Sequence, residues 1–225
     1  MNIIKALFQS TIGKKYVMAV TGLLLFGYVI LHLLGNLQIY MGPNAINGYG
    51  ALLHSRPALL WLARVILLAI FLTHVGTAIA LTLENWAARP IAYTIGPSPY
   101  TTYASRTMFI SGVILFCYIV YHVLHLTVGV VQPGIMDFKD QLGRPSIYRM
   151  LVAAFSNPWI ALSYMVAMGF LYFHLSHGIS SFFQSLGLKN RAYSGLILGF
   201  ALGAALVIFL GFLSIPLTVL TGLVK

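Results

Sequence analysis

Five long apolar stretches run through the chain and limit its possible folds more than any other feature. Each can cross a bilayer as a helix, because about 20 residues at a rise of about 1.5 Å span a hydrocarbon layer about 30 Å thick. A helix also satisfies its backbone hydrogen bonds within one segment, as lipid surroundings require. We therefore predict an all-α membrane protein with five transmembrane helices. We expect them at about residues 16–40, 58–84, 107–131, 159–186 and 193–222.

The composition excludes a water-soluble domain. Of the 225 residues, 60% are hydrophobic and 7% are charged, whereas soluble domains carry about 25% charged residues. The net charge of +10 comes from basic residues scattered over the loops, and these do not form the patch that binds nucleic acid. No connecting stretch is long enough to fold separately. We expect residues 1–225 to form a single domain with no nucleic-acid partner.

The orientation in the membrane is weakly encoded. With the N-terminus inside, seven basic residues fall on the inner side and six on the outer side, so the positive-inside rule separates the two orientations poorly. Lys5, Lys14 and Lys15 precede or open the first stretch without an acidic neighbour and favour a cytoplasmic N-terminus. We expect a multi-pass protein of the cytoplasmic (inner) membrane.

A histidine recurs at a similar depth in each of the first four stretches. His32, His74, His122 and His174 lie 16 or 17 residues beyond the polar segment that precedes their stretch, so each lies near the exit of its helix. Consecutive helices run in opposite directions, which places His32 level with His122. The same alternation places His74 level with His174, at a second depth.

Two such pairs predict two haem groups. Six-coordinate haem iron takes two axial imidazoles, and facing helices of a bundle are a common source of such ligands. Ionisable side chains inside a membrane are costly and tend to mark function, which favours metal ligands over isolated core histidines. We expect two b-type haems stacked across the bilayer, one within each pair. Both are noncovalent, because the one cysteine, Cys117, lies inside the third stretch and forms no CxxCH motif.

Other polar residues are candidates for contacts with these haems or with a quinone. Arg64 and Arg106 lie near the two levels and are candidate partners of haem propionates, with snorkelling to the headgroups as the alternative. His125 and His177 follow a ligand candidate by three residues, nearer the membrane surface, where a propionate, water or a quinone is the expected neighbour. For both, a cofactor contact and a water-bonded position stay open. The candidates for quinone binding are His54, His177, Ser181 and Gln184.

The fifth stretch carries no histidine. Gly195, Gly199 and Gly203 recur in it at the spacing of a close helix-packing face. We expect this helix to be structural.

Four segments resemble the di-haem cytochrome b subunit of succinate dehydrogenase and fumarate reductase. They are 32–38 (HLLGNLQ), 47–53 (NGYGALL), 157–159 (NPW) and 173–187 (FHLSHGISSFFQSLG), and the resemblance extends over nearly the whole chain. It implies five helices and two b haems ligated from the first four. It also implies that His32 and His122 hold the haem far from the soluble subunits. By the same resemblance, His74 and His174 hold the near one.

The resemblance further implies partners and a reaction. A flavoprotein subunit and an iron–sulfur subunit would be anchored on the inner face, and electrons would pass between the iron–sulfur subunit and a membrane quinone, usually menaquinone. Dicarboxylate chemistry would belong to a partner subunit, and a higher oligomer of the complex stays open. Some relatives couple transmembrane electron transfer to protons through buried glutamates. The second stretch has no carboxylate before Glu84, which argues against such coupling here.

Two alternatives stay open. One is the haem b subunit of another membrane oxidoreductase, such as a hydrogenase or formate dehydrogenase, which would share the histidines but not the four segments. The other is a haem-free transporter or assembly factor. Ion-coupled transporters usually place carboxylates within their spans. The acidic residues Glu84, Asp137 and Asp140 all lie at span ends or in loops, which disfavours a transporter.

Overall fold

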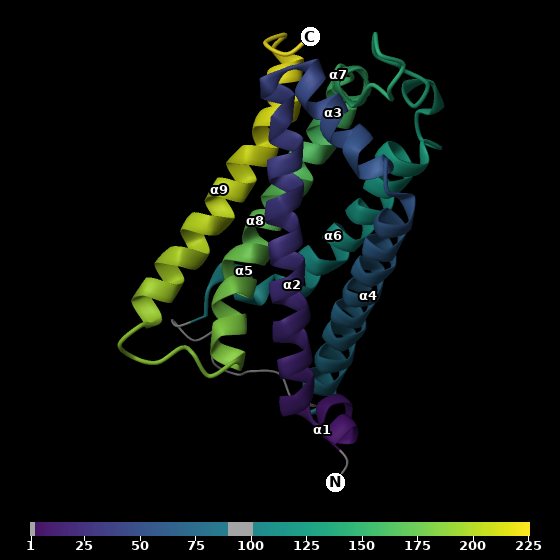
Figure 1. The fold of residues 1–225 in the computed structure, drawn as a ribbon. Coiled ribbons are helices and arrows are strands. Elements are labelled where there is room, and N and C mark those ends of the chain that lie inside the picture. The colour runs from purple at the N-terminus through teal and green to yellow at the C-terminus, as the bar shows by residue number, and fades with distance from the viewer. Residues whose placement is uncertain (1–2, 90–100) are drawn as a thin grey trace.

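Five long helices run between the two ends of the molecule in a computed structural model, which describes residues 3–89 and 101–225. They are α2 (Thr11–Leu37), α4 (Pro57–Ala87), α6 (Met108–Val123), α8 (Pro158–Ser185) and α9 (Ser194–Leu220) (Figure 1). A π-helical turn, η2 (Leu124–Val128), continues α6. With these extensions all five are long and apolar enough to cross a membrane. The described residues form no strand, and the chain is an all-α, multi-pass membrane protein, as predicted.

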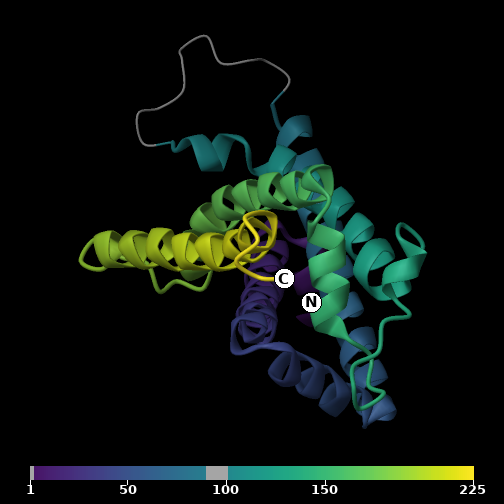
Figure 2. The ribbon, with the colours of Figure 1, turned by 90° about the horizontal axis from the view of Figure 1, so that it is seen from above.

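The two termini lie at opposite ends of the bundle, which we call the N-terminal end and the C-terminal end (Figure 1). The short helices α3 (Pro43–His54) and α7 (Ile147–Phe155) contact each other and cover the C-terminal end (Figures 1 and 2). The 3-10 turns η1 (Gln38–Met41) and η3 (Pro133–Ile135) lead into them. At the N-terminal end, α1 (Ile3–Gln9) packs against α2, and α5 (Tyr103–Arg106) precedes α6.

Local sequence explains where the long helices begin. The Ser10 hydroxyl accepts a hydrogen bond from the Gly13 amide (2.9 Å), and the Asn157 side chain accepts one from the Trp159 amide (3.0 Å). Both are N-caps of the kind that start helices. Pro158, like Pro57 in α4, occupies the first helical turn, where no N–H donor is needed. Because of the Ser10 cap, α2 starts five residues before its predicted position, and the other four starts agree within one residue.

The core centres on α8, which contacts α2, α6 and α9. Its contact with α9 is close because Ala201 and Ala205 are fully buried there, and small residues let helix backbones approach in membranes. The prediction that the glycines of α9 form its packing face is wrong. Gly195, Gly199 and Gly203 are exposed, and a side chain added at any of them would meet no described atom within 4 Å.

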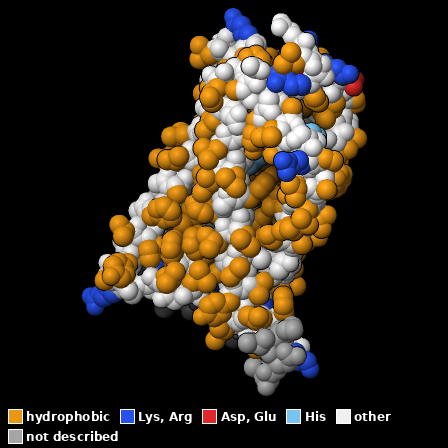
Figure 3. Space-filling model, in the orientation of Figure 1, with side chains coloured by type: hydrophobic (Ala, Val, Ile, Leu, Met, Phe, Trp, Pro, Cys, Tyr) orange, Lys and Arg blue, Asp and Glu red, His pale blue; other side chains and the backbone are white. Residues whose placement is uncertain are grey.

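The outer surface suits a bilayer. Figure 3 shows apolar side chains over the middle of the drawn face, with most of the visible lysine and arginine toward its two ends. Among the exposed side chains are Leu24, Leu62, Val113 and Leu196, one from each of four long helices. Contact with lipid tails is favourable for these apolar side chains, whereas contact with water would not be.

Candidate functional site

The structure brings the four histidines together in the two pairs that their depths predict. The rings of His32 (α2) and His122 (α6) lie 5.8 Å apart between centroids, toward the C-terminal end. The rings of His74 (α4) and His174 (α8) lie 6.5 Å apart, toward the N-terminal end. We call these the C-end pair and the N-end pair. All four rings are half-buried.

These separations suit axial ligands of one metal ion. With a metal–nitrogen bond of about 2 Å and a ring centroid about 1.1 Å behind the nitrogen, two axial imidazoles lie about 6 Å apart between centroids. Within residues 3–89 and 101–225, no three histidine, cysteine or acidic side chains gather into a site for a bare metal ion. A haem needs only two protein ligands, because the porphyrin nitrogens supply the other four.

The N-end pair is oriented by two hydroxyl groups. Nδ1 of His74 lies 3.1 Å from Thr21 Oγ1, and Nδ1 of His174 lies 3.3 Å from Ser111 Oγ. Each hydroxyl already donates its one proton to a backbone carbonyl of its own helix, Val17 for Thr21 (2.7 Å) and Met108 for Ser111 (2.9 Å). The hydroxyl oxygens must therefore accept from the rings.

This assigns the proton to Nδ1 and leaves the lone pair on Nε2 in His74 and His174. The side-chain hydrogen bonds found for both rings among the described residues are at Nδ1, and the Met18 carbonyl of α2 is a further acceptor beside the His74 ring. A ring with Nδ1–H bonded to an acceptor and Nε2 open is the state in which histidine binds a metal ion. The local chemistry of the N-end pair therefore fits an axial ligand set.

One spacing explains how two helices serve both pairs. Thr21 and Ser111 each precede the histidine of their own helix, at positions 32 and 122, by 11 residues. Eleven residues are about three helical turns, so hydroxyl and histidine share a face about 16 Å apart in depth. Glycine follows each hydroxyl. A Cβ at Gly22 would lie 3.3 Å from Cε1 of His74, and one at Gly112 would lie 3.7 Å from Cε1 of His174. The sequence analysis did not predict a role for Thr21–Gly22 or Ser111–Gly112. Their equal spacing from His32 and His122 could have indicated it.

The C-end pair is held differently. Nδ1 of His122 is buried without a hydrogen-bond partner in the described parts of the chain, and its ring packs against Tyr118 at 5.9 Å. The His32 ring stacks on Tyr28 at 5.6 Å, and Asn36 Nδ2 lies 3.4 Å from its Nε2. A buried ring nitrogen without a partner costs free energy, so the His122 ring is held by packing and not by a hydrogen bond to a described residue.

The two arginines occupy different settings. Arg64 is half-buried in α4, its guanidinium lies 5.0 Å from the centroid of the Trp61 ring, and it is an electrostatic neighbour of Tyr28 beside the C-end pair. Arg106 is exposed at the end of α5, the short helix before α6. Arg64 is therefore the better placed of the two for a contact near a histidine pair, and propionate binding by either stays a prediction.

The surroundings of His125 differ from the expected water, propionate or quinone. His125 is fully buried, with Nδ1 2.9 Å from the Tyr164 hydroxyl and Nε2 3.2 Å from Oε1 of Gln132. Both ring nitrogens of His125 therefore make hydrogen bonds with protein groups. The sequence placed His125 near the membrane surface by depth alone, and it could not reveal that α8 and the loop after η2 enclose the ring.

The quinone candidates fall into two places. His54 is exposed at the end of α3, and its Nδ1 donates to the Gly50 carbonyl (2.8 Å). His177 and Ser181 lie at the N-terminal end of the bundle, where the Ser181 hydroxyl is 3.0 Å from Nε2 of His177. Gln184 is exposed one turn farther along α8.

Lys189 also belongs to this end of α8. Its Nζ donates to the neighbouring Ser180 hydroxyl (2.9 Å), and its charge acts on His177. No sequence pattern indicates this position of Lys189, because it depends on the loop after α8 folding back toward Ser180.

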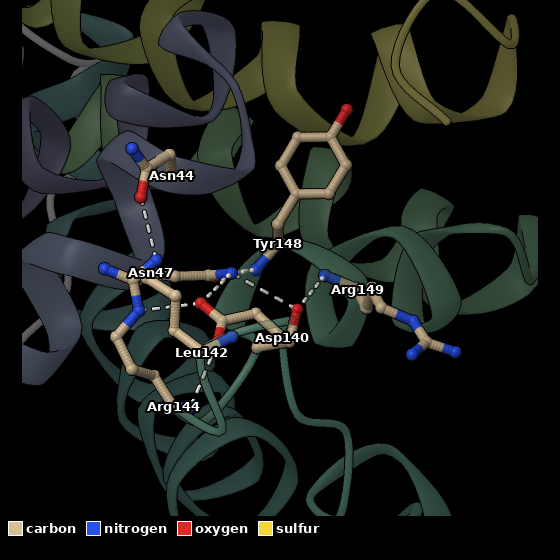
Figure 4. A network of polar contacts seen from close by, with 8 residues as sticks. Asn44, Asn47, Asp140, Leu142, Arg144, Tyr148 and Arg149 are labelled. Atoms are coloured by element: carbon tan, nitrogen blue, oxygen red, sulfur yellow. Dashed lines mark hydrogen bonds and ion pairs between the residues drawn. The ribbon is translucent and has the colours of Figure 1, made fainter.

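A polar network fixes the cap over the C-terminal end (Figure 4). Asn47 of α3 is 1% exposed, and its side-chain oxygen accepts from the Tyr148 amide of α7 (3.0 Å). Asp140, in the loop before α7, accepts from Arg144 Nε (2.7 Å) and from the Leu142 amide (3.0 Å). Partial burial alone would raise the pKa of Asp140, but these hydrogen bonds and the charge of Arg144 hold it below its ordinary value.

An ion pair closes the N-terminal end of the first two long helices. Lys14 of α2 pairs with Glu84 of α4. Glu84 therefore has a structural partner in the described part of the chain.

Comparison with known proteins identifies the family. Residues 87–212 match the sequence model of the succinate dehydrogenase/fumarate reductase transmembrane subunit. The match covers more than half of the chain and includes His122 and His174, while His32 and His74 lie before it. Neither the curated proteins nor the solved structures compared with the chain gave a match. The chain belongs to the family of succinate dehydrogenase/fumarate reductase transmembrane subunits, the membrane-anchor subunits of that redox enzyme complex.

Proposed function

We propose that this chain is a di-haem cytochrome b that carries electrons between the iron–sulfur subunit of its complex and a membrane quinone, with menaquinone as the expected quinone. The observation that carries the proposal is the pairing of four intramembrane histidines at two levels, with ring separations of 5.8 and 6.5 Å. Membership of the family alone implies a membrane anchor. The two histidine pairs support a further role, the passage of electrons through this anchor.

The roles of the residues follow from their geometry. His32 with His122 would hold one noncovalent b haem, and His74 with His174 would hold the other. Haem, when bound, supplies one-electron transfer between the ferric and ferrous states of its iron. Thr21 and Ser111 hold the N-end imidazoles in the tautomer that presents Nε2. The surrounding apolar helices exclude water and give the low dielectric in which these hydrogen bonds act strongly.

The two ends of the bundle receive different partners in this proposal. The N-terminal end, on the cytoplasmic side of the inner membrane, faces the iron–sulfur subunit, which in turn binds the flavoprotein subunit that carries out the dicarboxylate chemistry. The N-end pair then lies nearer that subunit, and the C-end pair lies across the bilayer. His54 is the quinone candidate near the C-terminal end. His177, Ser181 and Gln184 are the candidates near the N-terminal end.

A visible spectrum of the purified complex tests the proposal. We expect a reduced-minus-oxidised spectrum with sharp alpha bands of bis-histidine haem b, and two haems per copy of this chain by the pyridine haemochrome method. Menaquinol analogues should reduce both haems. A preparation with full subunit content and no haem in this chain would contradict the proposal and would leave only the anchoring role.

A further inference from the structure

His125 makes two directional contacts that leave its ring no freedom. Oε1 of Gln132 is only an acceptor, so Nε2 of His125 carries the proton and donates to it (3.2 Å). Nδ1 is then an acceptor, and the Tyr164 hydroxyl donates to it (2.9 Å). The ring is fully buried. A side chain with both nitrogens satisfied by protein groups is oriented on both sides, and it is not available as a metal ligand in this arrangement.

The backbone at His125 departs from regular α-helix. The residue lies in the π-helical turn η2, which follows directly after the end of α6. The turn is closed by Gly129, whose φ of +80° is unfavourable for other residues. Such π-turns are rare and occur frequently at functional sites. This one begins two residues after His122 of the C-end pair.

Tyr164 connects His125 to that pair. The Tyr164 ring is 5% exposed and lies 5.9 Å from the ring of His122 and 5.3 Å from that of Tyr118. Phe155 packs against it at 5.0 Å. The orientation of the Tyr164 ring is therefore set by packing and by one hydrogen bond, the bond to His125.

The two pairs differ in what holds their ligands. In the N-end pair, Thr21 and Ser111 bind Nδ1 of the ligands directly. Nδ1 of His122 has no such partner within the described residues, so the plane of this imidazole depends on the rings packed around it. Tyr164 is one of these rings, and its hydroxyl is held by the hydrogen bond with His125.

We propose that His125 is a positioning residue for the C-end haem: its hydrogen bond with Tyr164 fixes the ring against which His122 packs, and so sets the plane of the His122 imidazole. The proposal rests on the proposed function, because it requires a haem between His32 and His122. It assigns His125 an indirect role, in place of a contact with propionate or quinone.

Electron paramagnetic resonance of the oxidised complex measures this directly. In low-spin ferric haem the largest g value depends on the angle between the two axial imidazole planes, and the two haems give two signals. Tyr164→Phe removes the hydroxyl and keeps the ring. We expect it to shift the largest g value of the C-end signal and to leave the N-end signal in place as an internal reference. His125→Phe should shift the same signal in the same sense, and His125→Gln, which retains hydrogen-bonding groups, should restore it in part.

Tyr121→Phe is the matched control. The Tyr121 ring packs against both His125 and Tyr164, but its hydroxyl makes no hydrogen bond with the described residues. We expect this variant to leave both signals unchanged. If Tyr164→Phe retains two haems and an unshifted C-end signal, the positioning role is wrong while the proposed function stands. A wild-type complex without haem signals would instead refute the proposed function itself.

Discussion

Thr21→Val is expected to raise the reduction potential of the haem that we propose the N-end pair holds. Valine has nearly the shape of threonine, so the change removes the acceptor of the His74 Nδ1–H bond (3.1 Å) together with the hydroxyl's own bond to the Val17 carbonyl (2.7 Å). A hydrogen bond on Nδ1 makes the imidazole a more basic ligand, and a more basic ligand stabilises ferric iron over ferrous iron. Loss of the bond therefore favours the reduced state.

The expected shift can be bounded from the strength of one hydrogen bond. A neutral hydrogen bond contributes about 1 kcal/mol net, and about 1.4 kcal/mol corresponds to about 59 mV for a one-electron couple. If the whole bond differed between the two iron states, the potential would rise by about 40 mV. A partial difference gives a shift of roughly 10 to 40 mV, with the C-end haem unchanged.

A redox titration of the alpha band in the purified complex measures both potentials in one experiment. Thr82→Val is the matched control. Thr82 lies on α4, the helix of His74, and like Thr21 it donates to a carbonyl of its own helix, Ala78 (2.8 Å), but it has no histidine contact. An equal shift in the control, a downward shift in Thr21→Val, or a shift confined to the other haem would refute the reasoning.

Three further perturbations test the fold around the site, each by thermal unfolding in detergent. The lowered pKa of Asp140 means that its network adds stability above the unfolded pKa, near the ordinary 3.8, and loses it as pH falls through the lower folded value. Asp140→Asn should flatten this acid limb of the stability profile, and an unaltered limb would contradict the network's role. Gly35→Ala places a Cβ 2.8 Å from Cε1 of Tyr49 and should cost about 1 to 3 kcal/mol by overpacking, with wild-type stability as the opposing result. Ala205→Leu should cost a similar amount at the buried contact with α8, whereas Gly203→Leu on the exposed side should change stability little, and equal effects would show that α9 packs by the other face.

The positions of the four histidines could be predicted from the sequence because depth along a straight helix is a one-dimensional quantity. Counting residues from each loop placed His32 level with His122, and the structure confirms that their rings are neighbours. The helix starts were equally accessible, because proline and asparagine mark them locally. The α2 start is five residues earlier than predicted because its cap, Ser10, precedes Lys14 and Lys15, and charged residues fall outside an apolar stretch.

Features that depend on rotation about the helix axis were harder to predict. The glycines of α9 have a packing spacing, yet Ala201 and Ala205 face α8. The environment of His125 depends on a π-turn and on a glutamine that follows the helix, and neither has a pattern in hydrophobicity. Lys189 reaches Ser180 from a loop. The identity and depth of each paired histidine can thus be read from the local sequence, whereas the residues that contact its ring follow from tertiary packing.

Haem content of paired alanine variants tests the central claim most directly. The account predicts that His32→Ala with His122→Ala in one chain loses the C-end haem and keeps the other, with the potential of the N-end haem retained. It predicts that His32→Ala with His74→Ala loses both haems, because each pair then lacks one ligand. Retention of one haem by this cross-pair variant, or loss of both haems by the first variant in an otherwise assembled complex, would contradict the pairing.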